Sequence, residues 1–244
     1  MNLRILTAGG CHVVGYPIGE ANSFVAVMRR TLASQQIPTE TRSLSYLPVT
    51  HAGRLVEAVQ SFRPDITILQ LGNFETTTTF RQYFRRKLGL KRRKSSAQTL
   101  HLPPDSTFHR SAPWRLKCAL KLALDTLLRH DLVDMGALEL SFSRTFDALV
   151  DSNPGLVIVL DSLPCPDPLY MRYRERLQPV LRRLSTERGF HFVPEPLGRQ
   201  PETGCFADAT HLNAIGQVLL GETLANQVSQ FVNHGQELAD SVTV

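Results

Sequence analysis

Short runs of β-branched and leucine residues alternate with longer segments of helical periodicity along most of this chain. The strand-like runs lie at about 3–9, 40–46, 65–71, 155–161 and 190–194. The helical segments lie at about 20–35, 52–62, 113–131, 134–150, 167–188 and 213–232. Such alternation is typical of βαβ units, which build a parallel sheet with helices on its faces. The sequence therefore predicts an α/β three-layer sandwich, flavodoxin-like, around a central and mainly parallel sheet of five strands.

The composition fits one globular domain. With 244 residues, of which 42% are apolar and 20% charged, the chain can bury one sizeable core, and we expect a single domain over 1–244. No apolar run reaches the roughly 18 residues of a membrane span, and the amino-terminal residues lack a signal-peptide pattern. The four cysteines have no CxxC spacing and are expected to be free thiols. These features together predict a cytoplasmic protein without a transmembrane segment.

One segment interrupts the alternation. Residues 80–113 are first basic and then rich in Ser, Thr and Pro, and a stretch of this length is uncommon as a plain loop. The segment follows the third strand, and the carboxyl ends of parallel strands face the ligand crevice of such folds. We therefore predict a lid or cap insertion at about 76–133. The apolar face of the helix expected after Pro113 includes Trp114. This face packs on the core, forms a wall of an acyl-binding pocket or presents a surface for lipid.

Three short stretches, far apart in the sequence, carry the residue types of nucleophilic catalysis. Gly9-Gly10-Cys11 ends the first strand, Gly72-Asn73 ends the third, and Asp208-Ala209-Thr210-His211-Leu212 precedes the last helix. Glycines permit the sharp bend that lifts a side chain above the edge of a sheet. A thiolate is a stronger nucleophile than a hydroxyl, and a neighbouring histidine lowers the pKa of a cysteine thiol. The alternative for Cys11 is a small buried cysteine at a strand end.

In this order the three stretches resemble the SGNH (GDSL-type) hydrolases, and the match is closest over 206–216. The resemblance covers nearly the whole chain except the predicted insertion. It implies that Cys11 replaces the nucleophilic Ser of the family, that His211 is the general base, and that Asp208 orients its ring. The alternative reading of Asp208 is a helix cap next to an incidental histidine.

The resemblance also implies an oxyanion hole. Its donors would be the Cys11 backbone N–H, the Asn73 amide and the Gly53 N–H, the last being the only glycine between the second strand and the second helix. The sequence departs from the family at two places. Gly10 stands where the family has Asp, and Phe74-Glu75 follows Asn73 where an Asp is common. The second departure is expected to reshape the floor of the pocket.

The function that follows is acyl transfer through a Cys-His-Asp triad and a covalent thioester, in an acyltransferase, a thioesterase or an esterase. The alternative is a catalytically inactive relative that binds an acyl or glycan ligand. No cofactor is expected, because the first glycine turn lacks the GK[ST] ending of a phosphate loop and an intact GxGxxG. No metal is expected, because the histidines lack partners at ligand spacing.

The net charge of +5 is concentrated in one place. Residues 81–94 carry eight basic side chains and no acid, and removing them leaves the rest of the chain near −3. A local patch favours one anionic contact and gives no clear sign of nucleic-acid binding. We expect the acyl substrate to be either a small molecule or bound to a carrier. For a carrier-bound substrate, we expect Arg85, Arg86, Arg92 and Arg93 to dock an acidic acyl carrier protein. A solvated loop is the alternative, and an anionic membrane surface is a further one.

Overall fold

The protein is described here in a computed structural model, over residues 2–77, 79–88, 111–128, 132–197 and 203–242. Five strands form one sheet in the order β2-β1-β3-β4-β5, and every neighbouring pair is parallel. The strands are β1 (Leu3–Gly9), β2 (Thr39–Leu44), β3 (Ile66–Gln70), β4 (Leu156–Leu160) and β5 (His191–Val193). The predicted α/β fold with a five-stranded parallel sheet is confirmed.

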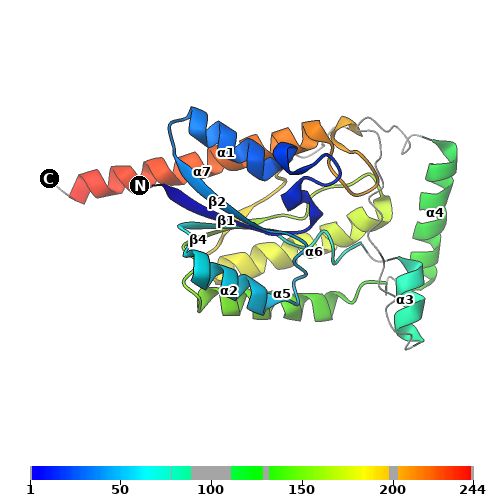
Figure 1. The fold of residues 1–244 in the computed structure, drawn as a ribbon. Coiled ribbons are helices and arrows are strands. Elements are labelled where there is room, and N and C mark those ends of the chain that lie inside the picture. The colour runs from blue at the N-terminus through cyan, green and yellow to red at the C-terminus, as the bar shows by residue number, and fades with distance from the viewer. Residues whose placement is uncertain (1, 78, 89–110, 129–131, 198–202, 243–244) are drawn as a thin grey trace.

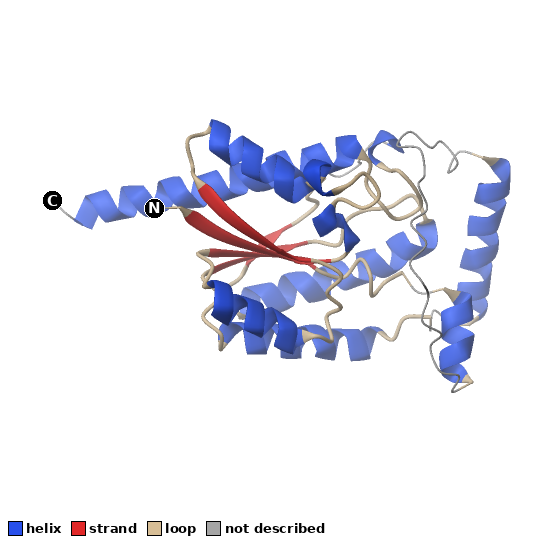
Figure 2. Ribbon diagram, in the orientation of Figure 1, coloured by secondary structure: helices blue, strands red, loops and turns tan. Residues whose placement is uncertain are grey.

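Helices cover both faces of the sheet (Figure 1, Figure 2). One face carries α1 (Phe24–Ser34) and α7 (Ala214–Val242), and the other carries α2 (Ala52–Phe62), α5 (Met135–Val150) and α6 (Pro168–Glu187). Each face has its own apolar core, built around Ile5, Ile68 and Leu160 on the α1 side and around Leu6, Leu69 and Val159 on the other. Alternate residues of one strand thus supply opposite cores, as the period of two in a strand requires.

The carboxyl ends of β1 and β3 lie unusually close together. A Cβ added to Gly9 would meet the Gln70 carbonyl oxygen at 2.4 Å, so only glycine fits at this position. Gly72 has φ +98°, in the region that favours glycine, and turns the chain sharply after β3. Because these are adjacent central strands, the loops that follow them meet at one edge of the sheet.

Two helices stand beyond this edge of the sheet, within the predicted insertion: α3 (Phe80–Lys87) and α4 (Ala112–Leu127) (Figure 1). The polar side of α4 packs against α6. Asp125 is fully buried and accepts hydrogen bonds from the Tyr173 hydroxyl at 2.5 Å and from Arg172 at 3.2 Å, while Lys121 pairs with Asp167 at 2.5 Å. These partners at the start of α6 explain why α4 turns its charged side inward.

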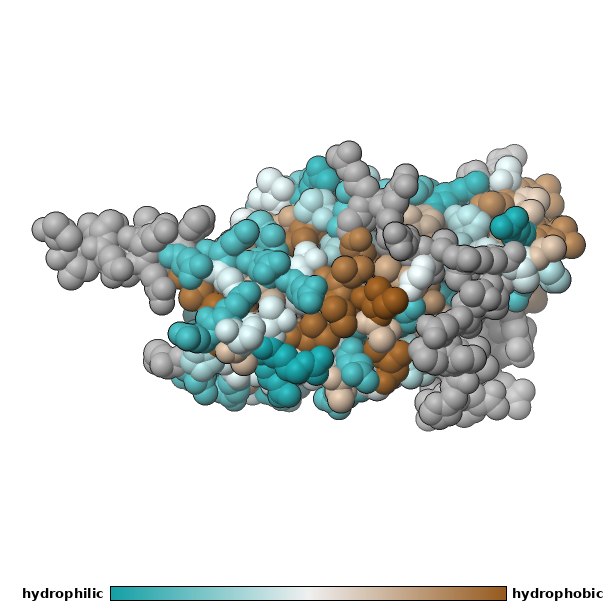
Figure 3. Space-filling model, turned by 90° about the horizontal axis from the view of Figure 1, so that it is seen from above, coloured by the Kyte–Doolittle hydropathy of each residue, from teal (hydrophilic) through white to brown (hydrophobic). Residues whose placement is uncertain are grey.

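Four of the five leucines of α4 face outward as a consequence, whereas Leu122 packs against the core. Leu116, Leu120, Leu124 and Leu127 are between 47% and 78% exposed, and apolar residues are visible at that end of the molecule (Figure 3). This is the reverse of a helix that packs on the core through its apolar face. In the part of the chain that the structure describes, no helix combines the length and the hydropathy that a membrane crossing needs.

Candidate active site

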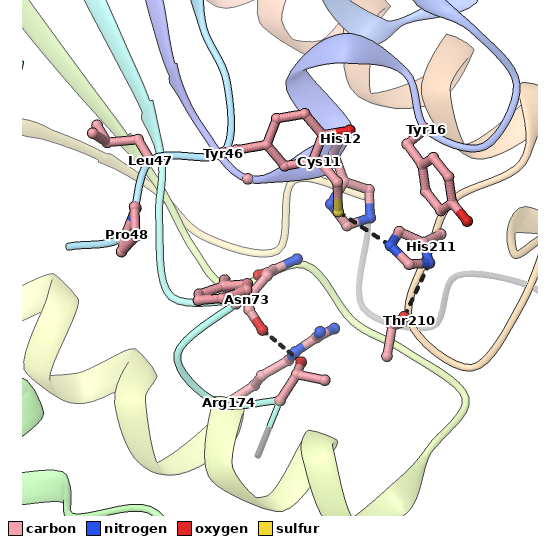
Figure 4. Close-up of a pocket in the computed structure, with 13 residues that line it drawn as sticks. Cys11, His12, Tyr16, Tyr46, Leu47, Pro48, Asn73, Arg174, Thr210 and His211 are labelled. Carbon is pink, nitrogen blue, oxygen red and sulfur yellow. Dashed lines mark hydrogen bonds between the residues drawn. The ribbon is translucent and has the colours of Figure 1, made fainter. Parts of the chain in front are cut away.

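Cys11 lies directly after β1, in the short 3₁₀ turn η1 (Cys11–Val14). Its Sγ is 3.1 Å from Nε2 of His211, and Nδ1 of that ring is 2.7 Å from Oδ2 of Asp208. The three side chains therefore form one hydrogen-bonded series: thiol, imidazole and carboxylate. Figure 4 shows the thiol and the imidazole facing each other across the mouth of a cavity.

The loop before α7 fixes the histidine through its own backbone. Oδ1 of Asp208 accepts the N–H groups of Thr210 at 2.7 Å and His211 at 2.8 Å, which leaves Oδ2 for the imidazole. At the end of the loop, the Asn213 side chain accepts the Gly216 N–H at 3.1 Å and so caps the start of α7. The Asp208 carboxylate thus both builds the turn and orients the ring that the turn presents.

The electrostatics of the site favour a charged pair. Burial alone would raise the pKa of the Cys11 thiol, but His12 and His211 outweigh burial and lower the pKa to about 5. Burial would likewise lower the pKa of His211, but Asp208 and Cys11 outweigh it and raise the pKa to about 9. Burial opposes ionisation of Asp208 too, yet its hydrogen bonds to His211 hold the pKa of this carboxyl below its usual range. At neutral pH the site therefore holds a thiolate beside an imidazolium.

Two aromatic neighbours frame the pair. The ring of Tyr16 meets His211 edge-on, with centroids 4.7 Å apart, and the ring of His12 lies 5.6 Å away from the same imidazole. His12 is buried, and its ring is one of the two groups that lower the pKa of the Cys11 thiol. Sequence reasoning gave neither residue a role, although His12 directly follows the predicted nucleophile.

Asn73 is held so that its amide nitrogen remains available. Its Oδ1 accepts the Leu163 N–H at 2.8 Å, while its buried Nδ2 has no partner among the residues that the structure covers. The side chain of Glu75 accepts the N–H groups of Val49 at 2.7 Å and Gly72 at 3.0 Å. This carboxylate, at the position where the sequence departs from the family, therefore ties together the loops after β2 and β3.

These groups open onto a cavity of about 410 Å³ (Figure 4). Its lining residues are Gly10, Cys11, His12, Tyr16, Tyr46, Leu47, Pro48, Asn73, Phe74, Thr77, Arg174, Thr210 and His211. Tyr46, Leu47, Pro48 and Phe74 make an apolar wall, of which Tyr46 and Phe74 are more than half exposed. A cavity with an apolar wall and a few convergent polar groups is the usual form of a small-molecule site.

The other predicted residues that the structure describes do not line the cavity. Gly53 is exposed in the first turn of α2, and half-buried Trp114 lies near the start of α4; the cavity lining includes neither residue. Arg85 and Arg86 belong to α3, whereas Arg92 and Arg93 fall outside the described residues. The structure thus brings Cys11, Asn73, Asp208 and His211 together, and it places Gly53, Trp114, Arg85 and Arg86 outside the cavity lining.

Solved structures of esterases share this fold. No family model matches the chain, and no curated protein matches it in sequence. The esterase EstA of Pseudoalteromonas sp. superimposes with a TM-score of 0.58 at 12% identity, covering 95% of this chain and 100% of the esterase. The family 3 carbohydrate esterase of Clostridium thermocellum gives 0.57 at 14% identity, over 93% and 94% of the two chains. A Desulfitobacterium hafniense protein assigned to the lipolytic G-D-S-L family gives 0.53 at 13% identity, over 92% and 99%. The structural neighbours of this chain are therefore esterases and lipases of the GDSL/SGNH type.

Proposed function

We propose that the protein is an acyl-transfer enzyme in which Cys11 forms a thioester with the acyl group of an ester or thioester. The observation that carries this proposal is the 3.1 Å contact between Sγ of Cys11 and Nε2 of His211, with Asp208 behind the ring. Nucleophile, base and orienting group in hydrogen-bond reach of one another are the structural signature of covalent catalysis. The esterase fold of the structural neighbours is consistent with this chemistry.

In the first step, the Cys11 thiolate attacks the carbonyl carbon, and the carbonyl electron pair moves to the oxygen. Nδ2 of Asn73 and the backbone N–H of Cys11 donate to that oxyanion, since the first N–H groups of η1 have no acceptor within the turn. The tetrahedral intermediate then collapses, the bond to the alkoxide or thiolate leaving group breaks, and the imidazolium of His211 gives up its proton to the leaving group.

In the second step, water or an acceptor attacks the thioester. Neutral His211 takes a proton from the incoming nucleophile, while Asp208 stabilises the imidazolium that forms. The second tetrahedral intermediate collapses with release of the Cys11 thiolate, and the starting pair is restored. Hydrolysis and transfer share every group in this scheme, so the nature of the acceptor decides between them.

Intact-mass measurement tests the proposal. The protein is incubated with p-nitrophenyl butyrate and with a butyryl thioester of a small thiol, and its mass is recorded at short times. We expect a gain equal to one butyryl group in the wild type and in His12→Gln, and no gain in Cys11→Ala. An inactive binding protein, the other interpretation of this fold, would release no p-nitrophenol and gain no mass.

We further propose that the basic stretch 81–94 docks an acidic acyl carrier protein. Thr77 lines the cavity and α3 starts three residues later, so the stretch begins at the cavity edge. Rim charges act mainly on the association rate and its salt dependence. Changing Arg85, Arg86, Arg92 and Arg93 to Glu should therefore lower kcat/KM for a carrier-bound thioester and spare a small one. Equal effects on both substrates would favour a solvated loop.

A further inference from the structure

Arg174 is a buried cation in the wall of the cavity. It lies on the face of α6 that carries Tyr173 and Leu177 toward the sheet, and it is only 2% exposed. Figure 4 shows its guanidinium reaching into the cavity on the side opposite Cys11, with Asn73 between them in this view. A guanidinium stays protonated even when it is buried, so this wall carries a permanent positive charge.

The partners of Arg174 do not neutralise this charge. One Nη1–H donates to the backbone carbonyl of Leu163, and the buried Nε has no hydrogen-bond partner. No carboxylate forms an ion pair with Arg174 within the described residues, and none of the residues that line the cavity is acidic. By contrast, Arg172 on the same helix pairs with buried Asp125. Arg174 is therefore a buried cation whose counter-ion the described residues do not supply.

The Cys11 thiolate is not the counter-ion of Arg174. The thiolate of Cys11 is balanced by the imidazolium of His211, and the two histidines are the groups that lower its pKa. Burying an unpaired charge is costly unless a partner of opposite sign reaches it. A bound anion would supply that partner, and the planar guanidinium suits carboxylate and phosphate oxygens.

We propose that Arg174 forms an anion-binding subsite of this cavity. On the proposed function, on which this assignment rests, the acyl substrate carries a monoanionic oxygen group, a carboxylate or a phosphodiester, away from the carbonyl that Cys11 attacks. The apolar wall of Leu47, Pro48 and Phe74 holds the part of the molecule between the two ends. Arg174 would thereby select a charged acyl compound over a neutral one of the same size.

Protection of Cys11 from alkylation tests the subsite without requiring turnover. The rate of Cys11 alkylation by iodoacetamide is measured at neutral pH and constant ionic strength, with butyrate, dimethyl phosphate or neutral butyramide added. In the wild type, we expect at least one of the two anions to protect saturably and at least about tenfold more effectively than butyramide, because hydrogen bonds to an ionised group are the stronger ones. The better of the two anions identifies the source of the charge.

Matched variants assign the effect to this arginine. Arg174→Met should lose the preference for the anion, Arg174→Lys should keep part of it, and Arg176→Met, an exposed arginine on the same helix, should behave as the wild type. If Arg174→Met does not fold, Arg174→Gln replaces it. Equal protection by butyrate, dimethyl phosphate and butyramide in the wild type, or an undiminished anion preference in the folded Met or Gln variant, would overturn the subsite.

Different results would contradict the anion subsite and the proposed acyl-transfer function. Thermal melting with the same three compounds records binding without any reaction of Cys11, and a Tm rise with an anion that Arg174→Met abolishes would support the subsite even if no ester or thioester is turned over. Conversely, the enzyme could acylate Cys11 while the ratio of its rates on p-nitrophenyl butyrate and the monoanionic p-nitrophenyl succinate is the same in wild type and in folded Arg174→Met. In that case the subsite is wrong and the proposed function stands.

Discussion

Sγ of Cys11 and Nε2 of His211 lie 3.1 Å apart although 200 residues separate them in the sequence. One residue follows the central strand β1, and the other precedes α7, which packs against α1. The contact between these two helices includes Gly221, where an added Cβ would meet the Val27 side chain at 2.6 Å. The distance between thiol and imidazole is therefore set by backbone packing on one face of the sheet.

Removing the thiol should abolish covalent chemistry. For Cys11→Ala, we expect no turnover of an ester or thioester substrate, because the thioester of the proposed mechanism forms on the Cys11 sulfur. Cys11→Ser should keep the fold and some slow hydrolysis, since His211 can deprotonate a hydroxyl less effectively. Steady-state rates on p-nitrophenyl butyrate check both variants. Wild-type turnover by purified Cys11→Ala would contradict the covalent mechanism.

The reactivity of Cys11 should be nearly independent of pH around neutrality. With a thiol pKa of about 5 and an imidazole pKa of about 9, the ion pair persists between these limits. The rate of iodoacetamide alkylation should therefore be flat over that range and fall below about pH 5, whereas an ordinary thiol reacts faster as pH rises toward about 8.5. Labelling of Cys11→Ala gives the background from the other three cysteines. A rate that climbs steadily from pH 6 to 8 would exclude the thiolate pair.

Loss of the Asp208 charge should act through His211. In Asp208→Asn the imidazolium loses its stabilising partner, so the pKa of His211 should fall and that of Cys11 should rise. We expect acylation to slow by about 10² to 10⁴-fold, with a smaller loss than in Cys11→Ala. Rapid-quench measurement of the acylation step gives the size of the effect. If both Asp208→Asn and His211→Ala acylate at the wild-type rate, the triad assignment is wrong.

His12 should tune the thiol rather than transfer protons. Since His12 contributes to the lowered pKa of Cys11, His12→Gln should shift the acid limb of the alkylation profile to higher pH. Acyl transfer should continue above the new midpoint. His191→Gln serves as the matched control, because His191 lies on the edge strand β5 and its ring hydrogen-bonds Gln227 of α7. An unchanged midpoint in a folded His12→Gln protein would remove His12 from the site electrostatics.

Asp125 should be important for attaching α4. Asp125→Ala leaves the Tyr173 hydroxyl and Arg172 without their acceptor, and loss of a buried hydrogen-bond partner costs about 1–3 kcal/mol in the free energy of unfolding. Glu175→Ala, on an exposed position of α6, should change stability by no more than about 0.5 kcal/mol. Urea denaturation of both variants measures the difference. Equal stability would mean that α4 docks by other contacts.

The regular part of the fold could be predicted from sequence periodicity. All five strands fall within two residues of their expected limits. The central strands β1, β3 and β4 are recognisable as short apolar runs, as buried strands of a parallel sheet usually are, whereas the edge strand β2 is largely polar. The helix expected at 20–35 starts only at Phe24, after a separate 3₁₀ turn at Glu20–Asn22. The helix α3 was not expected, because its basic residues were interpreted as part of a charged loop, although Phe80, Tyr83 and Phe84 have the i, i+3, i+4 spacing of an amphipathic helix.

The parts of the site that sequence missed depend on tertiary partners. Arg174 occupies a buried-face position of α6, four residues after Tyr170 and three before Leu177. A charged residue among the apolar residues of a buried helix face indicates a special role, but only the fold shows that Arg174 lines the cavity. The outward leucines of α4 could not be foreseen either, because the buried partners of its polar side lie in another helix.

During synthesis on the ribosome, His211 follows Cys11 by 200 residues. Until the loop before α7 docks on α1, the nascent chain carries Cys11 without this partner, and its thiol has less of the activation found in the finished protein. A prematurely terminated chain would therefore keep a weakly nucleophilic cysteine. Rapid alkylation of Cys11 would then report that synthesis has passed His211 and that the loop before α7 has docked.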